Sequence, residues 1–109
     1  MPDAGDIVMV DFVGATGIKR RPAVVISSAA YHAARPDLIL GVVTSNVGRA
    51  TTAFDHIIQD WQAAGLRMPS AFRTYINMAM PNMVRVIGRL TDRNWQAVRA
   101  CCERSMQSK

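Results

Sequence analysis

Short apolar runs separated by turn residues dominate the first half of the chain. Residues 6–12 alternate weakly and are rich in β-branched side chains, which predicts a strand that starts after Gly5. Residues 22–27 are nearly all apolar, as in a strand buried on both faces. Residues 37–45 form a third run, in which Gly41 predicts a bulge or a close approach of backbone. Three strands at this spacing favour a barrel or a sandwich.

Polar and turn-forming stretches separate these runs. Residues 13–20 contain two glycines and a basic end, which is typical of a flexible loop. Residues 28–36 form a connection with room for one helical turn over 29–34. Further strands are expected over residues 53–58, 71–77 and 83–87, with breaks at 46–52, 63–70 and 78–81.

The last element has the period of a helix. Thr91 is placed to cap it, and Asp92 in the first turn complements the helix dipole. Charged residues occupy mostly one side, whereas the apolar side consists of Trp95, Val98, Cys102 and Met106. We therefore expect a mainly β (α+β) fold, a small β-barrel with a C-terminal α-helix packed on it, in a single domain over residues 1–109.

Composition narrows the class of protein. A chain of 109 residues with 50% hydrophobic positions suits one compact domain. The longest apolar stretch, residues 38–43, is far shorter than the roughly 20 residues that span a bilayer. Asp3 and Asp6 stand where a signal peptide carries positive charge. We expect a cytoplasmic protein.

The net positive charge of the chain favours an anionic partner. Thirteen Lys and Arg against eight Asp and Glu give a net charge of +5, and eleven of the bases are arginine. Arginine suits phosphate recognition, although a GC-rich genome also enriches arginine, and composition leaves both explanations open. Cys101 and Cys102 are adjacent, and His32 and His56 stand alone, so we expect no disulfide framework, no metal and no cofactor.

Basic and hydroxyl side chains at strand ends are the first candidates for binding chemistry. Lys19, Arg20 and Arg21 follow a glycine-containing segment and could clamp a phosphate, although spacing alone favours a solvated charge run. Thr44 and Ser45 end the third strand, where a hydroxyl could face a ligand at the barrel rim. The commoner role is a hydrogen bond to the local backbone.

Further arginines interrupt apolar or polar segments. Arg73 and Arg85 lie within predicted strands, and both could line a groove for a polyanion or face solvent. Arg49 lies in a polar loop. No hydrolase triad, paired-carboxylate site or glycine-rich phosphate loop is supported by the spacing.

Aromatic side chains provide candidates for base stacking. Tyr31, Phe54, Trp61 and Tyr75 could stack on unpaired bases, but aromatics at strand ends usually belong to a core or an interface. We favour a core or dimer-interface role for Phe54 and Trp95 and leave Trp61 and Tyr75 open.

Five segments, in the same order, resemble the PemK/MazF family of toxin endoribonucleases from toxin–antitoxin pairs. They are residues 5–12, 21–27, 42–45, 61–73 and 87–91. The resemblance covers nearly the whole chain. It implies an SH3-like barrel (PemK/CcdB-like) that forms a homodimer, cuts single-stranded mRNA without a metal and is restrained by an acidic antitoxin.

The resemblance also implies a reaction and roles for residues. The ribose 2′-hydroxyl would attack the adjacent phosphodiester, giving a 2′,3′-cyclic phosphate and a 5′-hydroxyl end. Arg21 would stabilise the phosphate and transfer a proton, Thr44 would orient the phosphate, and Arg73 would supply a second arginine. The residues assigned to RNA binding are Lys19, Arg20, Ser45, Arg49 and Arg85.

The chain departs from the family pattern at three positions. Tyr75 stands where certain members carry an aspartate, and Ala79 and Pro81 stand where a threonine and an aspartate often follow. The alternative is therefore a non-catalytic member of the same fold, acting as a CcdB-like gyrase poison or as a binder of RNA or antitoxin.

Overall fold

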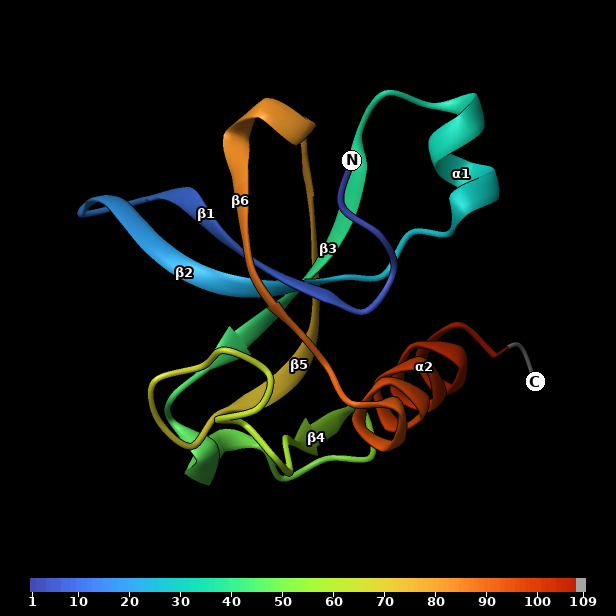
Figure 1. The fold of residues 1–109 in the computed structure, drawn as a ribbon. Coiled ribbons are helices and arrows are strands. Elements are labelled where there is room, and N and C mark those ends of the chain that lie inside the picture. The colour runs from blue at the N-terminus through green and yellow to red at the C-terminus, as the bar shows by residue number, and fades with distance from the viewer. Residues whose placement is uncertain (108–109) are drawn as a thin grey trace.

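A curled six-stranded antiparallel sheet forms the body of the protein, with one long helix beside it (Figure 1). This computed structural model describes residues 1–107. The sheet order is β4-β5-β3-β2-β1-β6, so β4 and β6 are the two edges. The predicted mainly β architecture with a C-terminal helix is confirmed. Its elements are β1 (Asp6–Gly14), β2 (Gly17–Val25), α1 (Ala29–Ala34), β3 (Leu38–Thr44), β4 (Asp55–Ile57), β5 (Ala71–Ala79), β6 (Val84–Arg89) and α2 (Asp92–Met106), with 3₁₀ turns at Val47–Arg49 and Pro81–Met83.

The two faces of the sheet bury separate apolar clusters. Successive side chains of a strand point to opposite faces, so Val24 enters one core while Ala23 and Val25 enter the other. Helix α2 contacts β4 and β5 and covers the first core. That core includes Ile7, Val24, Val43, Phe72, Val98 and Cys101, and the second includes Val8, Val10, Ala23, Val25, Leu38 and Leu40.

The predicted flexible loop over residues 13–20 is wrong, because most of it is a hairpin. Strands β1 and β2 pair as far as Gly14 and Gly17, which leaves a two-residue turn between them. Gly17 has a φ of +124°, a conformation that side chains rarely adopt. Residues 17–20 are exposed on both faces of the hairpin. Because neither face is buried, their sequence shows no apolar alternation that would predict a strand.

Gly41 is a point of close approach, as the sequence predicted. The register of β3 against β5 shifts between Gly41 and Val42. The fully buried Phe72 ring occupies the space that a Cβ at position 41 would need. This packing fixes β5 tightly against β3.

Helix α2 packs three of its four predicted apolar residues, Trp95, Val98 and Cys102, against the first core. Cys101 rather than Cys102 is the fully buried cysteine, and Met106 is 70% exposed, which departs from the prediction. Within residues 1–107, no helix is long and apolar enough to cross a membrane.

Asn94 is a buried polar residue that joins α2 to the segment after β4. Its Oδ1 accepts hydrogen bonds from His56 Nε2 at 2.8 Å and from the Gln59 backbone N–H at 2.9 Å. Its Nδ2 donates to the Gln59 carbonyl and to the Thr91 hydroxyl. Asn94 therefore forms hydrogen bonds to backbone groups that an apolar side chain at this position could not form.

Candidate functional site

The pleat of β2 divides the basic triplet between two faces of the sheet. Arg20 lies directly opposite Asp11 of β1, and its Nε donates to the Asp11 carboxylate at 2.9 Å. Lys19 and Arg21 point to the other face, since side chains alternate along a strand. The three residues therefore do not form one clamp.

The three predicted catalytic residues leave the same face of three neighbouring strands. Val42 of β3 pairs with Ala23 of β2 on one side and with Arg73 of β5 on the other. Arg21 lies two residues from Ala23, and Thr44 lies two residues from Val42. Because the side-chain period of a strand is two, Arg21, Thr44 and Arg73 share a face.

Thr44 has a hydroxyl with capacity left for a ligand. Its Oγ1 accepts a hydrogen bond from the Asn46 backbone N–H at 3.1 Å, which is the local role considered from the sequence. The hydroxyl proton can still be donated, for example to a phosphate oxygen. Ser45 and Arg49 follow on the exposed segment after β3.

A buried carboxylate that the sequence did not single out lies beside Arg73. Asp55 of β4 pairs with Arg73 in the sheet, and Arg73 Nε is 3.4 Å from Asp55 Oδ1. The Asp55 side chain is only 4% exposed. Its Oδ2 accepts from the Thr52 hydroxyl at 2.8 Å and from the Thr52 N–H at 3.1 Å. Only the order of the strands could have revealed this contact.

These partners determine the protonation of Asp55. Burial by itself raises the pKa of Asp55, but hydrogen bonds from Thr52 and the charge of Arg73 outweigh it, so the pKa lies below its ordinary value. The ionised carboxylate therefore stabilises the folded state and holds one side of the Arg73 guanidinium.

Asp55→Asn is expected to lower the free energy of unfolding at pH 7 but not in strong acid. The folded-state pKa is below the ordinary value of 3.8, so the contribution is complete above the unfolded pKa and is lost as the pH falls through the folded one. Chemical denaturation at a series of pH values should show the two proteins converging. Asp3→Asn is the control, since Asp3 is exposed; a pH-independent deficit in Asp55→Asn would contradict this linkage.

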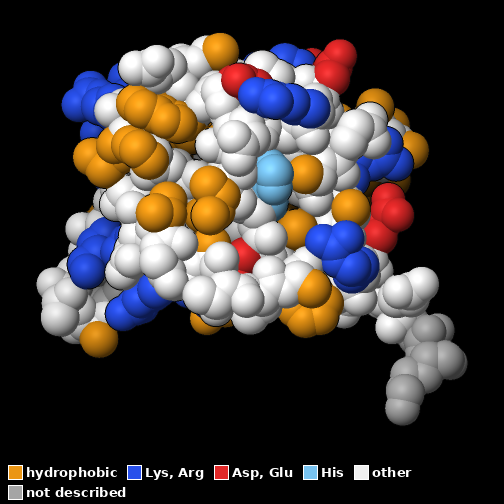
Figure 2. All heavy atoms as spheres, turned by 90° about the horizontal axis from the view of Figure 1, so that it is seen from below, with side chains coloured by type: hydrophobic (Ala, Val, Ile, Leu, Met, Phe, Trp, Pro, Cys, Tyr) orange, Lys and Arg blue, Asp and Glu red, His pale blue; other side chains and the backbone are white. Residues whose placement is uncertain are grey.

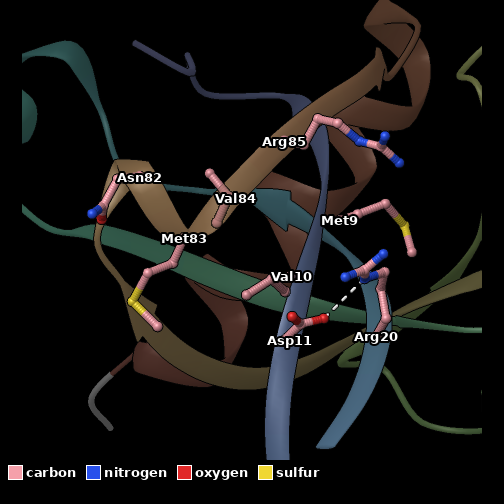
Figure 3. A pocket seen from close by; sticks show the side chains of 8 residues that line it. All are labelled: Met9, Val10, Asp11, Arg20, Asn82, Met83, Val84 and Arg85. Carbon is pink, nitrogen blue, oxygen red and sulfur yellow. Dashed lines mark hydrogen bonds and ion pairs between the residues drawn. The ribbon is translucent and has the colours of Figure 1, made fainter.

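A shallow groove of about 270 Å³ lies between β6 and the β1–β2 hairpin, and its basic residues leave the face opposite Arg21. Met9 pairs with Arg85 and Asp11 with Arg20, so both arginines line this groove. Figure 3 shows Met9 between the two guanidinium groups, with Asp11 holding Arg20. The structure thus groups Arg20 with Arg85 and separates them from Arg21, Thr44 and Arg73.

The aromatic candidates fall into two groups. Trp61 and Trp95 pack against the first core, which confirms the core role for Trp95. Phe54 does not lie in the core of this chain, because β4 begins only at Asp55 and leaves Phe54 in the preceding turn, 42% exposed. A place for Phe54 in an interface stays a prediction. Tyr75 is 58% exposed.

The cysteines are held by burial and the histidines by hydrogen bonds in the part of the chain that the structure describes. Burial raises the pKa of Cys102 to about 11 and also raises that of Cys101. The His32 side chain is hydrogen-bonded to Ser27, and the His56 side chain is hydrogen-bonded to Asn94. Among residues 1–107, no three His, Cys, Asp or Glu side chains lie close enough to hold a metal ion together.

The chain is similar to known toxins in both sequence pattern and fold. Residues 3–106 match the family model described as the PemK-like, MazF-like toxin of type II toxin–antitoxin systems. A search of curated proteins finds no similar sequence.

Solved structures of the same fold have low sequence identity to this chain. An endoribonuclease in complex with its cognate antitoxin from a mycobacterial species has a TM-score of 0.79 at 12% identity, covering 100% of both chains. A chain of the MazE–MazF structure (Form-II) from Deinococcus radiodurans has a TM-score of 0.73 at 21% identity, covering 99% of this chain and 97% of that one. The Mycobacterium tuberculosis toxin MazF-mt6 has a TM-score of 0.72 at 16% identity, covering 92% and 94%.

Proposed function

The chain belongs to the PemK-like, MazF-like toxins of type II toxin–antitoxin systems, and on that premise we propose that it is an endoribonuclease that cleaves single-stranded mRNA and so inhibits translation and growth. The observation that carries the proposal is the common face of Arg21, Thr44 and Arg73 on three neighbouring strands. The toxin works as one domain over residues 1–109, in the cytoplasm.

The proposed reaction is an internal transesterification of RNA. The ribose 2′-oxygen forms a bond to the adjacent phosphorus, and the bond to the 5′-oxygen breaks. The 2′ proton is removed and the leaving oxygen is protonated, with Arg21 stabilising the phosphate and assisting proton transfer. Thr44 donates to a phosphate oxygen, and Arg73 adds a second cation near the developing charge.

The remaining cations are assigned to the RNA backbone. Arg20 and Arg85 line the groove of Figure 3, and they could hold phosphates away from the cleaved bond. Lys19, Ser45 and Arg49 lie on exposed segments near the ends of β2 and β3. Cationic side chains also surround the face seen from below, with apolar side chains within it (Figure 2). This distribution suits a strand of RNA that crosses the protein.

The proposed partners are a second copy of the chain and an acidic antitoxin. β6 is an edge strand, and apolar side chains are exposed along it and before it. Methionine-rich apolar surface of this kind is typical of interfaces. The residues are Met80, Met83 and Val86. Light scattering of the purified protein measures whether it is a dimer. Competition between RNA and an acidic antitoxin peptide, repeated at rising salt concentration, measures the binding of the peptide.

The decisive experiment is cleavage of a long single-stranded RNA by the purified, antitoxin-free protein in EDTA. We expect cuts at a short recurring sequence, with 2′,3′-cyclic phosphate and 5′-hydroxyl ends. Intact RNA after incubation with the folded protein would contradict the proposed activity. Cleavage that stops in EDTA would contradict its independence of metal ions.

Thr44→Ala is expected to slow cleavage by about 100-fold, or about 2.7 kcal/mol of transition-state stabilisation, the lower end of the usual loss for one neutral donor. The substitution removes one donor to the phosphate but leaves both arginines in place. Single-turnover cleavage of a saturating RNA measures the effect. Thr44→Ser, which keeps the hydroxyl, should stay close to the wild-type rate; equal losses in the two variants would contradict a role as donor.

A further inference from the structure

Two exposed aromatic side chains meet at a second hollow of the surface. Phe54 and Tyr75 are the aromatic residues of the described chain that remain largely exposed, at 42% and 58%. Both line a hollow of about 220 Å³, together with Asp55 and Arg73. Burying an aromatic side chain is strongly favourable, so two of them left at one hollow indicate a surface that binds something flat and apolar.

The backbone of β5 places Tyr75 in this position. Val42 pairs with Arg73, but the preceding residue of β3, Gly41, pairs with Ile76. Two extra residues of β5, Thr74 and Tyr75, therefore lie between these pairs. Extra residues of this kind re-aim side chains beside binding sites.

The Phe54 side of the hollow is held firmly before any ligand arrives. The Phe54 N–H donates to Thr52 Oγ1 at 3.2 Å, and the Phe54 carbonyl accepts from Thr74 Oγ1 at 2.7 Å. Arg104 of α2 donates twice to the preceding carbonyl, that of Ala53, at 3.0 and 2.6 Å. A fixed wall loses little conformational entropy on binding.

Arg73 places a positive charge beside the aromatic side chains of the hollow. Its guanidinium carbon lies 4.6 Å from the centre of the Tyr75 ring, and its Nε is held by Asp55. Within residues 1–107, no protein acceptor bonds its two terminal nitrogens. These nitrogens are free to donate to a phosphate or to the edge of a base.

We propose that this hollow is a stacking subsite for one unpaired nucleobase of RNA. The proposal rests on the function proposed above and adds Phe54 and Tyr75 as residues that bind and select the substrate. An aromatic wall beside an arginine suits a flat base linked to a phosphate. An acidic peptide fits less well, because the hollow also holds the Asp55 carboxylate and offers aromatic surface that such a peptide would not use.

Binding of an RNA that cannot be cut tests the subsite separately from catalysis. The probe is a fluorescent single strand of about 10 nucleotides with 2′-O-methyl groups on every ribose, which blocks the attacking oxygen. Tyr75→Ala and Phe54→Ala should each raise Kd by about 5- to 150-fold, the usual range for the loss of one base stack. Tyr75→Phe, and Met68→Ala as an exposed apolar control, should bind like the wild type.

Two further readouts separate stacking from charge. Tyr75→Ala removes no cation, so the slope of log Kd against log salt should not change, whereas Arg73→Gln should reduce it by about one. A strand of the same backbone without bases should bind the wild type more weakly than the intact strand. In Tyr75→Ala this difference should shrink. An unchanged difference would overturn the stacking subsite.

The outcomes distinguish the subsite from the proposed activity. If the wild-type protein cuts unmodified RNA but Tyr75→Ala and Phe54→Ala neither weaken binding nor alter the cut sequence, the subsite is overturned and the nuclease stands. If binding depends on both aromatics but no RNA is cut, the subsite stands and the nuclease is overturned. If the two variants weaken only an acidic peptide, or no RNA binds, the subsite is overturned.

Discussion

Arg21→Ala is expected to lower the rate of the proposed RNA cleavage by at least about 1000-fold and to leave the fold and the proposed dimer intact. A cation that meets the phosphate as negative charge develops contributes more than a neutral donor, for which a loss of about 100- to 1000-fold is usual. Arg21 belongs to neither buried cluster, so its removal should change the free energy of unfolding very little.

Single-turnover cleavage, light scattering and thermal unfolding together test this expectation. Arg67→Ala is the matched control, since Arg67 is exposed in the segment before β5. This substitution removes the same charge from the protein as Arg21→Ala does. A variant that cuts RNA at the wild-type rate would show that the reaction is performed elsewhere. A variant that is inactive and also unfolded would show that Arg21 is structural.

Asn94→Ala is expected to lower the free energy of unfolding by about 2 to 4 kcal/mol. The change deprives His56 and two backbone groups of Gln59 of their partners, and each buried group left unpaired costs about 1–3 kcal/mol. The free energy of unfolding of a domain of this size is about 5–15 kcal/mol. The melting temperature should therefore fall by at least about 10 °C.

Urea unfolding measures the effect directly. Asn82→Ala is the control, because Asn82 is exposed and its loss should change stability by no more than about 0.5 kcal/mol. If Asn94→Ala unfolds at the wild-type urea concentration, the bonds that join α2 to the segment after β4 contribute nothing net to stability.

The elements with a clear local period were predictable, and those without one were not. The sequence predicts β1 from weak alternation, β3 from an apolar run and α2 from helical spacing, and it correctly predicts a close approach at Gly41. The start of β2 was missed because its first residues are exposed and include glycine, so that they resemble a loop.

The candidate site was only partly readable from the sequence. The family motifs predict Arg21, Thr44 and Arg73, and the structure places them on one face. No local pattern marks Asp55, because its importance depends on β4 pairing with β5. The sequence predicts Phe54 inside a strand and hence in a core or an interface, whereas β4 begins at the next residue and leaves Phe54 outside the core of this chain.

The sequence by itself determined the secondary structure that has a strong period, the family motifs and the residue types available for chemistry. These features are local, since a strand or a helix shows its period within a few residues. Only the tertiary structure decided which side chains share a site: Asp55 contacts Arg73, Arg20 and Arg85 line one groove, and Phe54 and Tyr75 line one hollow. Pairing between distant strands depends on sheet order and core packing, and a shift of one residue reverses the face of every side chain.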